Sequence, residues 1–390
     1  MFKNLHIRDY DFKLILMIVA INVLGILAIG SANSANLSRQ ILGTCLGFFL
    51  MIVLSFIDYR ILLKFYWVAY FADIMLLLAV RFFGSSAGGA QRWFEIAGIR
   101  FQPSETAKIL LIIFFAQFII KYKDKINTFS FIVSFMVLAG IPMFLIYNQP
   151  DLSTTMVIAI MLCAILLVAG ISWKLILGAC ALLIPTAVVF LSIILKEGQT
   201  LIDAYQRKRI LSFIYPEKYV DDAYQQTNAV IAIGSGRLTG KGLNNNVIGS
   251  MNNGNYIIAP DTDFIFSVIG EELGFVGCLV VILLLFGIAI ECILIARKSK
   301  DVGGRVIAAG MGTLVAIQSF FNMGVATFIL PNTGLPLPFV SYGLTSLVSL
   351  YIGMGFVLNV RFRSGETQTR NESNELNIDI DLRMSLDETI

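Results

Sequence analysis

Long apolar stretches alternate with short polar connections along most of the chain. A helix that crosses a membrane needs about 20 mostly apolar residues, and ten stretches reach or approach that length. The eighth is long enough to tilt or to extend beyond the bilayer. The pattern predicts an all-α integral membrane protein whose ten helices fall near 14–31, 41–57, 63–80, 105–121, 129–147, 153–170, 174–195, 263–295, 304–326 and 339–360.

Two of the connections are much longer than the others, and both fall on the same predicted side of the membrane. They cover about 81–104 and 196–262, and the second joins the seventh and eighth predicted helices. Residues 1–363 form one polytopic membrane domain in this prediction. The remainder, 364–390, is polar and acid-rich, so we expect a disordered cytoplasmic tail there.

Basic residues in the connections give the helices a direction. Lysine and arginine concentrate in the cytoplasmic loops of membrane proteins. They cluster at 60–64, 121–125, 174, 297–305 and 361–363, which share one side if the N-terminus lies inside, whereas the short connections on the other side hold few. We therefore expect both termini in the cytoplasm and the two long loops outside.

Composition narrows the classes of function. Of the 390 residues, 57% are hydrophobic and 14% charged, against about 25% charged in soluble domains. The net charge of +3 is dispersed over segment ends, which argues against a nucleic-acid partner. The only histidine is His6 in the N-terminal segment. A histidine metal site or a serine–histidine triad is therefore nearly excluded, and proton transfer falls to carboxylates, lysine, tyrosine or water.

The first long loop carries candidate binding residues. Arg92 and Trp93 place a cation beside an amphipathic ring, a pair that suits a lipid-interface anchor as well as a substrate contact. The run QPSE at 102–105 is typical of a helix start, with proline near the first turn and an acid that complements the dipole. Lys108 follows Glu105 by three positions, so the two share a helix face. The spacing leaves a structural and a functional ion pair equally open.

The second long loop combines basic and glycine-rich stretches. Around 201–218, apolar side chains surround Arg207 and Arg209, a pattern typical of a helix on the membrane surface. The same pattern suits a diphosphate, because arginine forks match phosphate oxygens. Further along, four glycines around Lys241 could bring backbone amides to an anionic group, although the stretch lacks the Walker spacing.

Acidic residues stand at the predicted outer ends of two helices. Asp263 precedes the eighth helix and Asp151 the sixth. Such a carboxylate can cap its helix, or it can act as a base beside a membrane cavity. Charges at membrane depth are costly unless they face a cavity. The proline- and glycine-rich stretch 331–346 predicts irregular backbone, which at membrane depth must be covered by protein or line a water-filled cavity. We predict one shared polar cavity, to which further polar residues belong: Asp73, Glu271, Glu272 and Asn322.

Six motifs give the chain a specific resemblance. They are GAQRWFEIAGIRFQPSE, QPDLST, YQRKRILSFIYPE, YQQTNAVIAIGSG with GKGL, DTDFIFSVIGEELG and LPNTGLPLPFVSYG. In these motifs the chain resembles the SEDS family of cell-wall polymerases (RodA, FtsW and SpoVE), and most of all its RodA branch. The motifs span nearly the whole membrane region in the family's order and at the family's spacing.

The resemblance implies a ten-helix SEDS bundle in the bacterial cytoplasmic (inner) membrane that polymerises peptidoglycan. The implied substrate is lipid II, an undecaprenyl-diphosphate-linked disaccharide pentapeptide. The implied partners are a class B penicillin-binding protein and the cell-wall elongation machinery. The family's essential acid maps to Asp263, and its other site residues map to Trp93, Glu105, Lys108 and Asp151.

The chain departs from the family pattern close to that acid. Ala259 and Asp261 stand where the family usually has a glutamate and a histidine, and Leu344 replaces a glycine. Asp263 itself is retained. The missing histidine argues against a histidine that assists the acid.

The resemblance also implies an inverting transfer, because the lipid-linked donor sugar is α-linked and the glycan is β-1,4-linked. Such a transfer needs a base on the acceptor hydroxyl and stabilisation of the leaving group. We expect Asp263 to accept the proton and a divalent cation, Mg²⁺ or Mn²⁺, or basic side chains to bind the diphosphate; the candidates are Arg92, Arg207, Arg209 and Lys241. Two other functions stay open: a lipid II flippase and a scaffold that recruits the transpeptidase.

Overall fold

The structure is a computed structural model, and it describes residues 10–87, 90–96, 99–175, 177–178, 181, 192–193, 204–244 and 256–364. Nine helices within these ranges are long and apolar enough to cross a membrane. They are α1 (Phe12–Ala32), α2 (Ser34–Phe56), α4 (Tyr66–Phe83), α5 (Pro103–Lys121), α6 (Phe129–Tyr147), α7 (Leu152–Ala169), α11 (Ile265–Lys298), α12 (Val302–Ala326) and a C-terminal helix, Leu344–Ser364.

These helices confirm the predicted membrane fold at nine of its ten spans. The remaining span, 174–195, falls mostly outside the described residues, as do 365–390 of the predicted tail. The last helix begins five residues later than the predicted 339, because the backbone before Leu344 is irregular.

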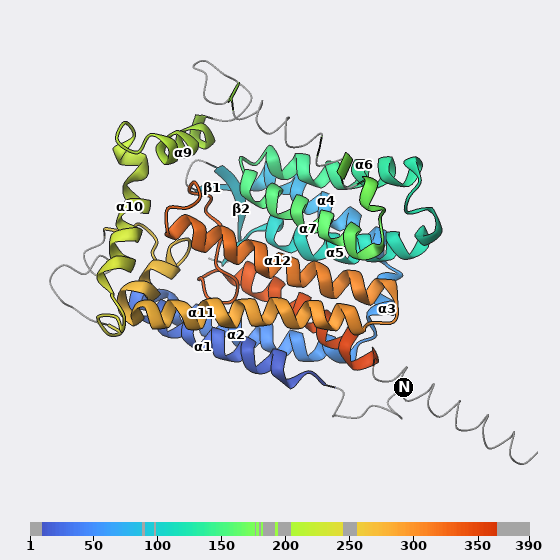
Figure 1. The fold of residues 1–390 in the computed structure, drawn as a ribbon, viewed down its shortest axis with the longest axis horizontal. Coiled ribbons are helices and arrows are strands. Elements are labelled where there is room, and N and C mark those ends of the chain that lie inside the picture. Colours follow the sequence, from blue (N-terminus) through green and yellow to red (C-terminus); the bar gives the residue numbers. More distant parts are fainter. Residues whose placement is uncertain are drawn as a thin grey trace, which may run out of the picture.

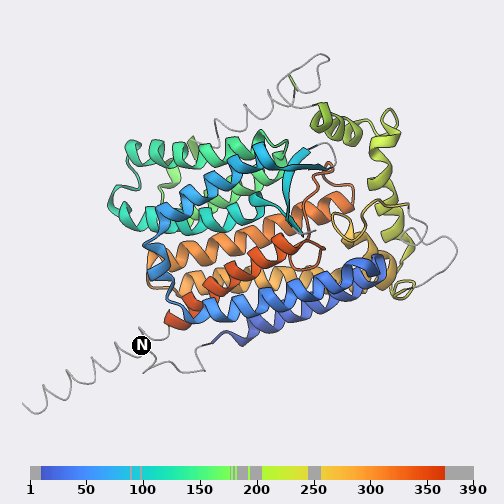
Figure 2. The same ribbon diagram turned by 180° about the vertical axis from the view of Figure 1, so that it is seen from behind.

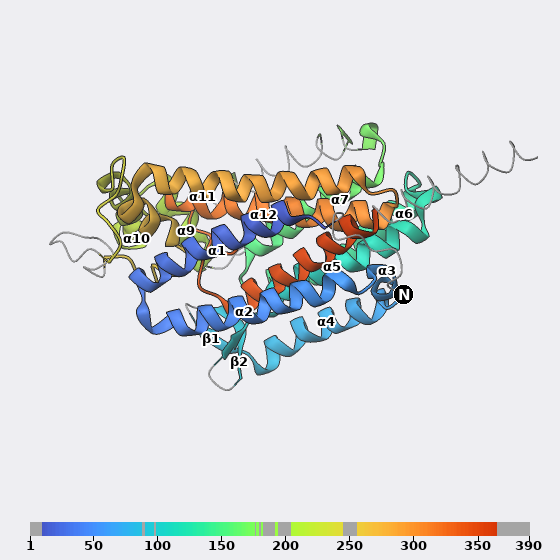
Figure 3. The ribbon, with the colours of Figure 1, turned by 90° about the horizontal axis from the view of Figure 1, so that it is seen from below.

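Two helices form the centre of the bundle. In the spanning parts of α5 and α12, 78% and 72% of the residues are buried, against 22% in α2 and 28% in α6. α11 packs on α12 and α1, and it lies on the opposite side of the bundle from α4 (Figures 1 and 3). The outer helices keep large apolar side chains exposed, as expected where lipid rather than protein covers them.

The two ends of the bundle differ. At one end, a small antiparallel sheet of β1 (Ser85–Ala87), β2 (Ala90–Ile96) and β3 (Ile99–Phe101) lies near α9 (Ala204–Ile214) and α10 (Val220–Ser235) (Figures 1 and 2). We call this the sheet end. The opposite end, which we call the α3 end, carries α3 (Tyr59–Leu63) and the short 3₁₀ helix η2 (Lys123–Lys125). The all-α prediction missed the sheet, which forms within the first long loop.

The stretch 331–343, which we call the Pro-Gly segment, is non-helical between α12 and the C-terminal helix, as predicted. Backbone carbonyls at membrane depth need partners when no helix supplies them. Side-chain donors fill this role: Ser153 Oγ to Thr333 O (2.9 Å), Gln318 Nε2 to Pro336 O (2.9 Å), Asn322 Nδ2 to Leu335 O (2.7 Å) and, just before the segment, Gln226 Nε2 to Leu330 O (2.9 Å). Polar side chains on α7, α12 and α10 thus fix an irregular wall.

α11 is not one continuous helix. Gly274 has non-helical torsions, φ 66° and ψ −162°, and breaks it after two turns. The carbonyls freed at the break accept the N–H groups of Lys241 and Gly242, at 3.0 and 2.9 Å. The glycine-rich loop was expected to offer its amides to an anion. Two of these amides instead hold the first part of α11, so that interpretation was wrong for them.

Candidate functional site

A partly open cavity of about 770 Å³ lies where the sheet, α9, α10, the turn before α11 and the Pro-Gly segment meet. Five of the predicted site residues line it: Arg92, Trp93, Glu105, Arg209 and Asp263. The first and last of these residues, Arg92 and Asp263, are more than 170 positions apart in the sequence. The fold therefore brings the first long loop, the second long loop and the start of α11 to one place.

Asp263 lies in the turn that precedes α11, and its backbone is firmly held. Its carbonyl accepts the Nδ2 group of Asn322 at 2.8 Å, and the same nitrogen donates to the Pro-Gly segment. The N-cap of α11 is Phe264, and no side chain in the described part of the chain caps the helix. The carboxylate of Asp263 therefore does not cap α11, one of the two functions that the sequence allows. It faces the cavity instead.

Arg209 of α9 shares the space around this carboxylate. A Cβ atom added at Gly334 would lie 3.3 Å from Oδ2 of Asp263 and 3.4 Å from Nη1 of Arg209. Arg209 Nη1 also donates to the carbonyl of Asn332 at 3.4 Å. Gly334 has φ +68°, in the left-handed region that glycine adopts readily. The Pro-Gly segment therefore approaches both charged groups closely because it carries no side chain at this position.

The charges around Asp263 affect its proton affinity in opposite directions. Burial raises the pKa of Asp263 above the usual value, whereas the nearby cations Arg209 and Arg92 lower it. The neighbouring acids Asp151 and Asp261 add a smaller upward effect on this pKa. A carboxylate with a raised pKa is a stronger proton acceptor once it is ionised.

Arg92 is held between the sheet and the start of α7. Its Nε donates to the carbonyl of Gln149 at 2.9 Å, its Nη2 to the carbonyl of Pro150, and its Nη1 lies 3.7 Å from Oδ2 of Asp151. The other oxygen of Asp151 caps α7 through Thr154 N at 3.1 Å. Asp151 therefore orients Arg92 and caps the start of α7. Of these two residues, Arg92 is the one that lines the cavity.

Glu105 and Lys108 form the ion pair that their spacing predicted. Lys108 Nζ lies 2.8 Å from Oε1 of Glu105 and 2.8 Å from Oε1 of Gln318, and both charged side chains are at least 97% buried. Gln318 in turn donates to the carbonyl of Pro336. This chain of contacts joins α5 and α12 to the Pro-Gly segment, and Glu105 is its member at the cavity surface.

Other predicted residues lie elsewhere. Neither Arg207 nor Lys241 is among the described residues that line the cavity, and Lys241 Nζ contacts Oε1 of Glu271 at 2.7 Å. Asp73, Glu271 and Glu272 are buried away from the lining. Asn322 and Asp151 do not line the cavity either. The prediction of a single polar cavity was therefore wrong for these five residues, whose side chains are buried within the protein instead.

Sequence reasoning missed several residues of the cavity. Arg39 of α2 and Arg100 of β3 line it, together with Asn36 and Tyr342. Arg39 and Arg100 lie on the predicted outer side, where few basic residues are expected. Their presence there was the feature of the sequence that could have pointed to the cavity. From the sequence, Asp261 is only a departure from the family pattern. Its Oδ2 accepts Asn36 Nδ2 at 2.7 Å, so it joins the turn before α11 to α2.

The described residues offer no ready metal site. Within them, no three His, Cys, Asp or Glu side chains converge closely enough to hold an ion. Asp151 is engaged with Arg92, and Asp261 with Asn36. These residues do not fit a divalent cation held by the protein alone. The expected Mg²⁺ or Mn²⁺ stays a prediction, and we derive no step through it.

Comparisons with known proteins identify the family of this chain. The sequence profile of the FtsW, RodA and SpoVE cell cycle proteins matches residues 10–365. The peptidoglycan glycosyltransferase MrdB of Escherichia coli K12 is 33% identical, covering 90% of this chain and 93% of its own. FtsW of Geobacter sulfurreducens is 32% identical, with 92% and 96% covered.

Solved structures show the same fold. RodA of Thermus thermophilus superposes with a TM-score of 0.65 at 27% identity and covers 90% of this chain and 96% of its own. A chain of a peptidoglycan synthase complex that coordinates polymerization and crosslinking reaches a TM-score of 0.74 at 29% identity, with 91% and 98% covered. The chain described here belongs to the FtsW/RodA/SpoVE family of membrane proteins.

Proposed function

We propose that this protein is a peptidoglycan glycosyltransferase that joins lipid II disaccharides into β-1,4 glycan strands. The observation that carries the proposal is the cavity at the sheet end, where the Asp263 carboxylate and the guanidinium groups of Arg209 and Arg92 line one space. The relatives that carry the name peptidoglycan glycosyltransferase match over nearly their whole length, which supports the same activity here.

Asp263 would act as the general base. The 4-hydroxyl oxygen of the acceptor N-acetylglucosamine attacks C1 of the donor sugar, and its proton passes to the Asp263 carboxylate. The bond between C1 and the diphosphate oxygen breaks on the opposite face, which inverts the configuration. The electron pair leaves with undecaprenyl diphosphate, whose negative charge Arg209 and Arg92 stabilise through charge-assisted hydrogen bonds.

The site geometry suits such a step because its charged groups are held in advance. Asn322 fixes the backbone of Asp263, Asp151 orients Arg92, and the Pro-Gly segment lies against Arg209. Groups that are already oriented stabilise developing charge without reorganising. Diphosphate is a good leaving group, so the mechanism asks for no general acid.

The proposal includes the placement of the protein in the membrane. With both termini in the cytoplasm, the sheet end faces outward, and the sugars of lipid II reach the cavity while the lipid tail lies along the helices. A class B penicillin-binding protein is the proposed partner. The match to a chain from a complex that couples polymerization to crosslinking supports this partner.

The test is polymerisation of labelled lipid II by the purified protein with its transpeptidase partner. Asp263→Asn keeps the shape but cannot accept the proton, so we expect the rate to fall by about 10²-fold or more. Asp222→Asn is the control, since Asp222 is an exposed acid in the first turn of α10 and is not among the described residues that line the cavity. A folded Asp263→Asn protein with near-normal polymerisation would exclude this base. The absence of any polymer from the unaltered protein in detergent would favour a flippase or a scaffold.

A further inference from the structure

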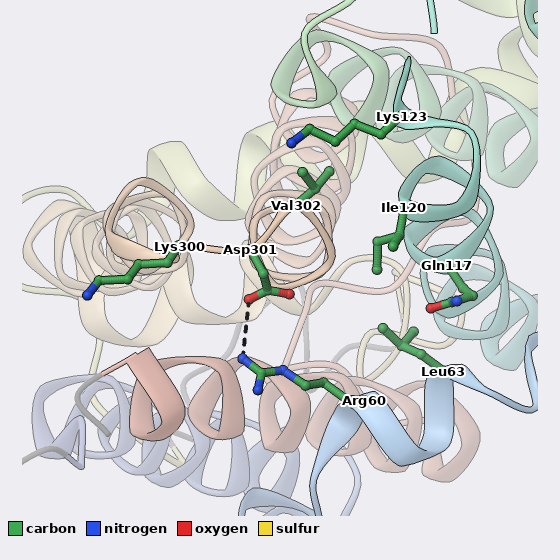
Figure 4. A pocket seen from close by; sticks show the side chains of 8 residues that line it. All are labelled: Arg60, Leu63, Gln117, Ile120, Lys123, Lys300, Asp301 and Val302. Carbon is green, nitrogen blue, oxygen red and sulfur yellow. Dashed lines mark ion pairs between the residues drawn. The ribbon is translucent and has the colours of Figure 1, made fainter. Parts of the chain in front are cut away.

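A second pocket, of about 420 Å³, lies at the α3 end, far from the cavity described above. Three cations, Arg60, Lys123 and Lys300, line it, and Leu63, Ile120 and Val302 give it an apolar floor (Figure 4). The cations come from α3, from η2 and from the connection between α11 and α12. Segments far apart in the sequence thus bring positive charge around one opening.

Among the described residues that line the pocket, the one carboxylate, Asp301, already has partners. Asp301 caps α12 through Gly304 N at 3.1 Å, and its Oδ1 accepts the hydroxyl of Tyr59 at 2.6 Å. Arg60 Nη2 lies 4.0 Å from the same oxygen, as the dashed line in Figure 4 shows. This contact is long, and 52% of the Arg60 side chain stays exposed. Asp301 therefore positions Arg60 without consuming its hydrogen-bonding capacity.

The two lysines carry uncompensated charge. No ion pair or hydrogen bond to another described residue occurs for the side chain of Lys123 or Lys300, and both residues are exposed. In Figure 4 Lys123 reaches over the pocket from η2, whereas Lys300 extends outward at its rim. Three cations and one engaged carboxylate leave the pocket with an excess of positive charge, which favours an anionic ligand.

The apolar surroundings narrow the kind of anion. A Cβ atom added at Gly303 would lie 2.6 Å from Cδ1 of Ile120, so the glycine allows α12 to close the floor with aliphatic side chains. Ile120, which belongs to this floor, is 36% exposed, so an apolar chain can reach it. A ligand that fits here combines a charged group with apolar chains, as a phospholipid does.

We propose that the pocket at the α3 end binds the phosphate headgroup of an anionic phospholipid from the cytoplasmic leaflet. Arg60 and Lys123 contact the phosphate oxygens, Lys300 adds charge at the rim, and the acyl chains lie along the apolar floor at Ile120. Basic pockets on the cytoplasmic side of membrane helices are suited to such headgroups. The inference rests on the proposed orientation of the bundle and is independent of the glycosyl transfer at the other end.

The experiment measures lipid retention by native mass spectrometry on the full-length protein in detergent, with phosphatidylglycerol or phosphatidylcholine added in separate samples. The test variant is Lys123→Gln with Lys300→Gln. The control variant, Lys64→Gln with Lys125→Gln, removes the same charge from the same end without altering the pocket lining. We expect the test variant to bind phosphatidylglycerol about 30-fold more weakly, and the control to bind it like the unaltered protein.

Each other outcome overturns the proposal. Equal phosphatidylglycerol retention by the test and control variants would show that these cations bind no headgroup. Retention of phosphatidylcholine as strong as that of phosphatidylglycerol would exclude charge recognition. Full displacement by glycerol phosphate would identify a soluble phosphate ligand. A carbodiimide cross-link from Lys123 or Lys300 to a glutamate in 365–390 would make the acidic tail the occupant.

Discussion

Gly334 offers the sharpest test of the proposed site, because its one missing side chain determines how closely two charged groups approach the Pro-Gly segment. In Gly334→Ala the new methyl group would lie 3.3 Å from Oδ2 of Asp263 and 3.4 Å from Nη1 of Arg209. The separation from Oδ2 is shorter than ordinary van der Waals contact and that from Nη1 is at its lower edge, so the carboxylate must move by about a few tenths of an ångström. A displacement of about 1 Å in an active site can cost 10²-fold in rate. We therefore expect polymerisation to fall by about 5- to 10-fold.

The substitution also strains the backbone, and this effect needs its own control. A non-glycine residue in the left-handed region costs about 1–2 kcal/mol, which lowers stability wherever it occurs. Gly170 has φ +97° at the end of α7, and a Cβ added there meets nothing within 4 Å. Gly170→Ala therefore carries similar strain without touching the site.

The assay compares polymerisation of labelled lipid II and thermal unfolding in detergent for the two variants. We expect similar losses of stability, but less than about 2-fold loss of activity in Gly170→Ala. The reasoning would be refuted if Gly334→Ala, folded and as stable as the control, polymerised lipid II at the control's rate. In that case the contact between the Pro-Gly segment and the two charged groups has no bearing on the transfer.

Two further substitutions test the electrostatics. Arg209→Gln removes a cation that lowers the pKa of Asp263, so this pKa should rise. Since the base works only when ionised, activity disappears as pH falls through that pKa, and the acid limb of the pH–rate profile should move to higher pH. An unmoved limb would contradict the assignment of Asp263 as the base. In Glu105→Gln the buried Lys108 loses the carboxylate that compensates its charge. We expect a loss of about 3 kcal/mol in stability, seen as a lower unfolding temperature and partly recovered when Lys108→Met is added. An unchanged unfolding temperature would show that the ion pair is not structural.

Most of the fold could be predicted from the chain because the bilayer imposes one length scale on every spanning helix. The start of α5 at Pro103, the pairing of Glu105 with Lys108 and the irregular backbone after α12 all followed from local rules. The small sheet at 85–101 did not, because strands of three to seven residues leave too short a pattern to stand out in a glycine-rich loop.

The site was predicted in part, and the failures share a cause. Asp263, Arg92 and Arg209 line one cavity, as expected from an acid at a helix end and from arginines in the two long loops. Lys241 has the same local character, yet it contacts Glu271. No single-sequence pattern tells a cation that faces solvent from one that faces a buried acid, since the partner lies 30 positions away on another element.

Polar residues buried in this bundle have two different tasks, and burial alone does not separate them. Gln226, Gln318 and Asn322 donate to carbonyls in or beside the Pro-Gly segment, where unpaired backbone would cost several kcal/mol. Asp263 and Arg209 instead direct their charged groups at the cavity. The three amide side chains support the position of the two charged groups. They satisfy the carbonyls of the Pro-Gly segment, and the segment can therefore hold Gly334 against the carboxylate and the guanidinium without moving away from them. Where the bilayer leaves irregular backbone without water, a rigid wall beside charged groups therefore depends on polar side-chain donors on the helices behind it.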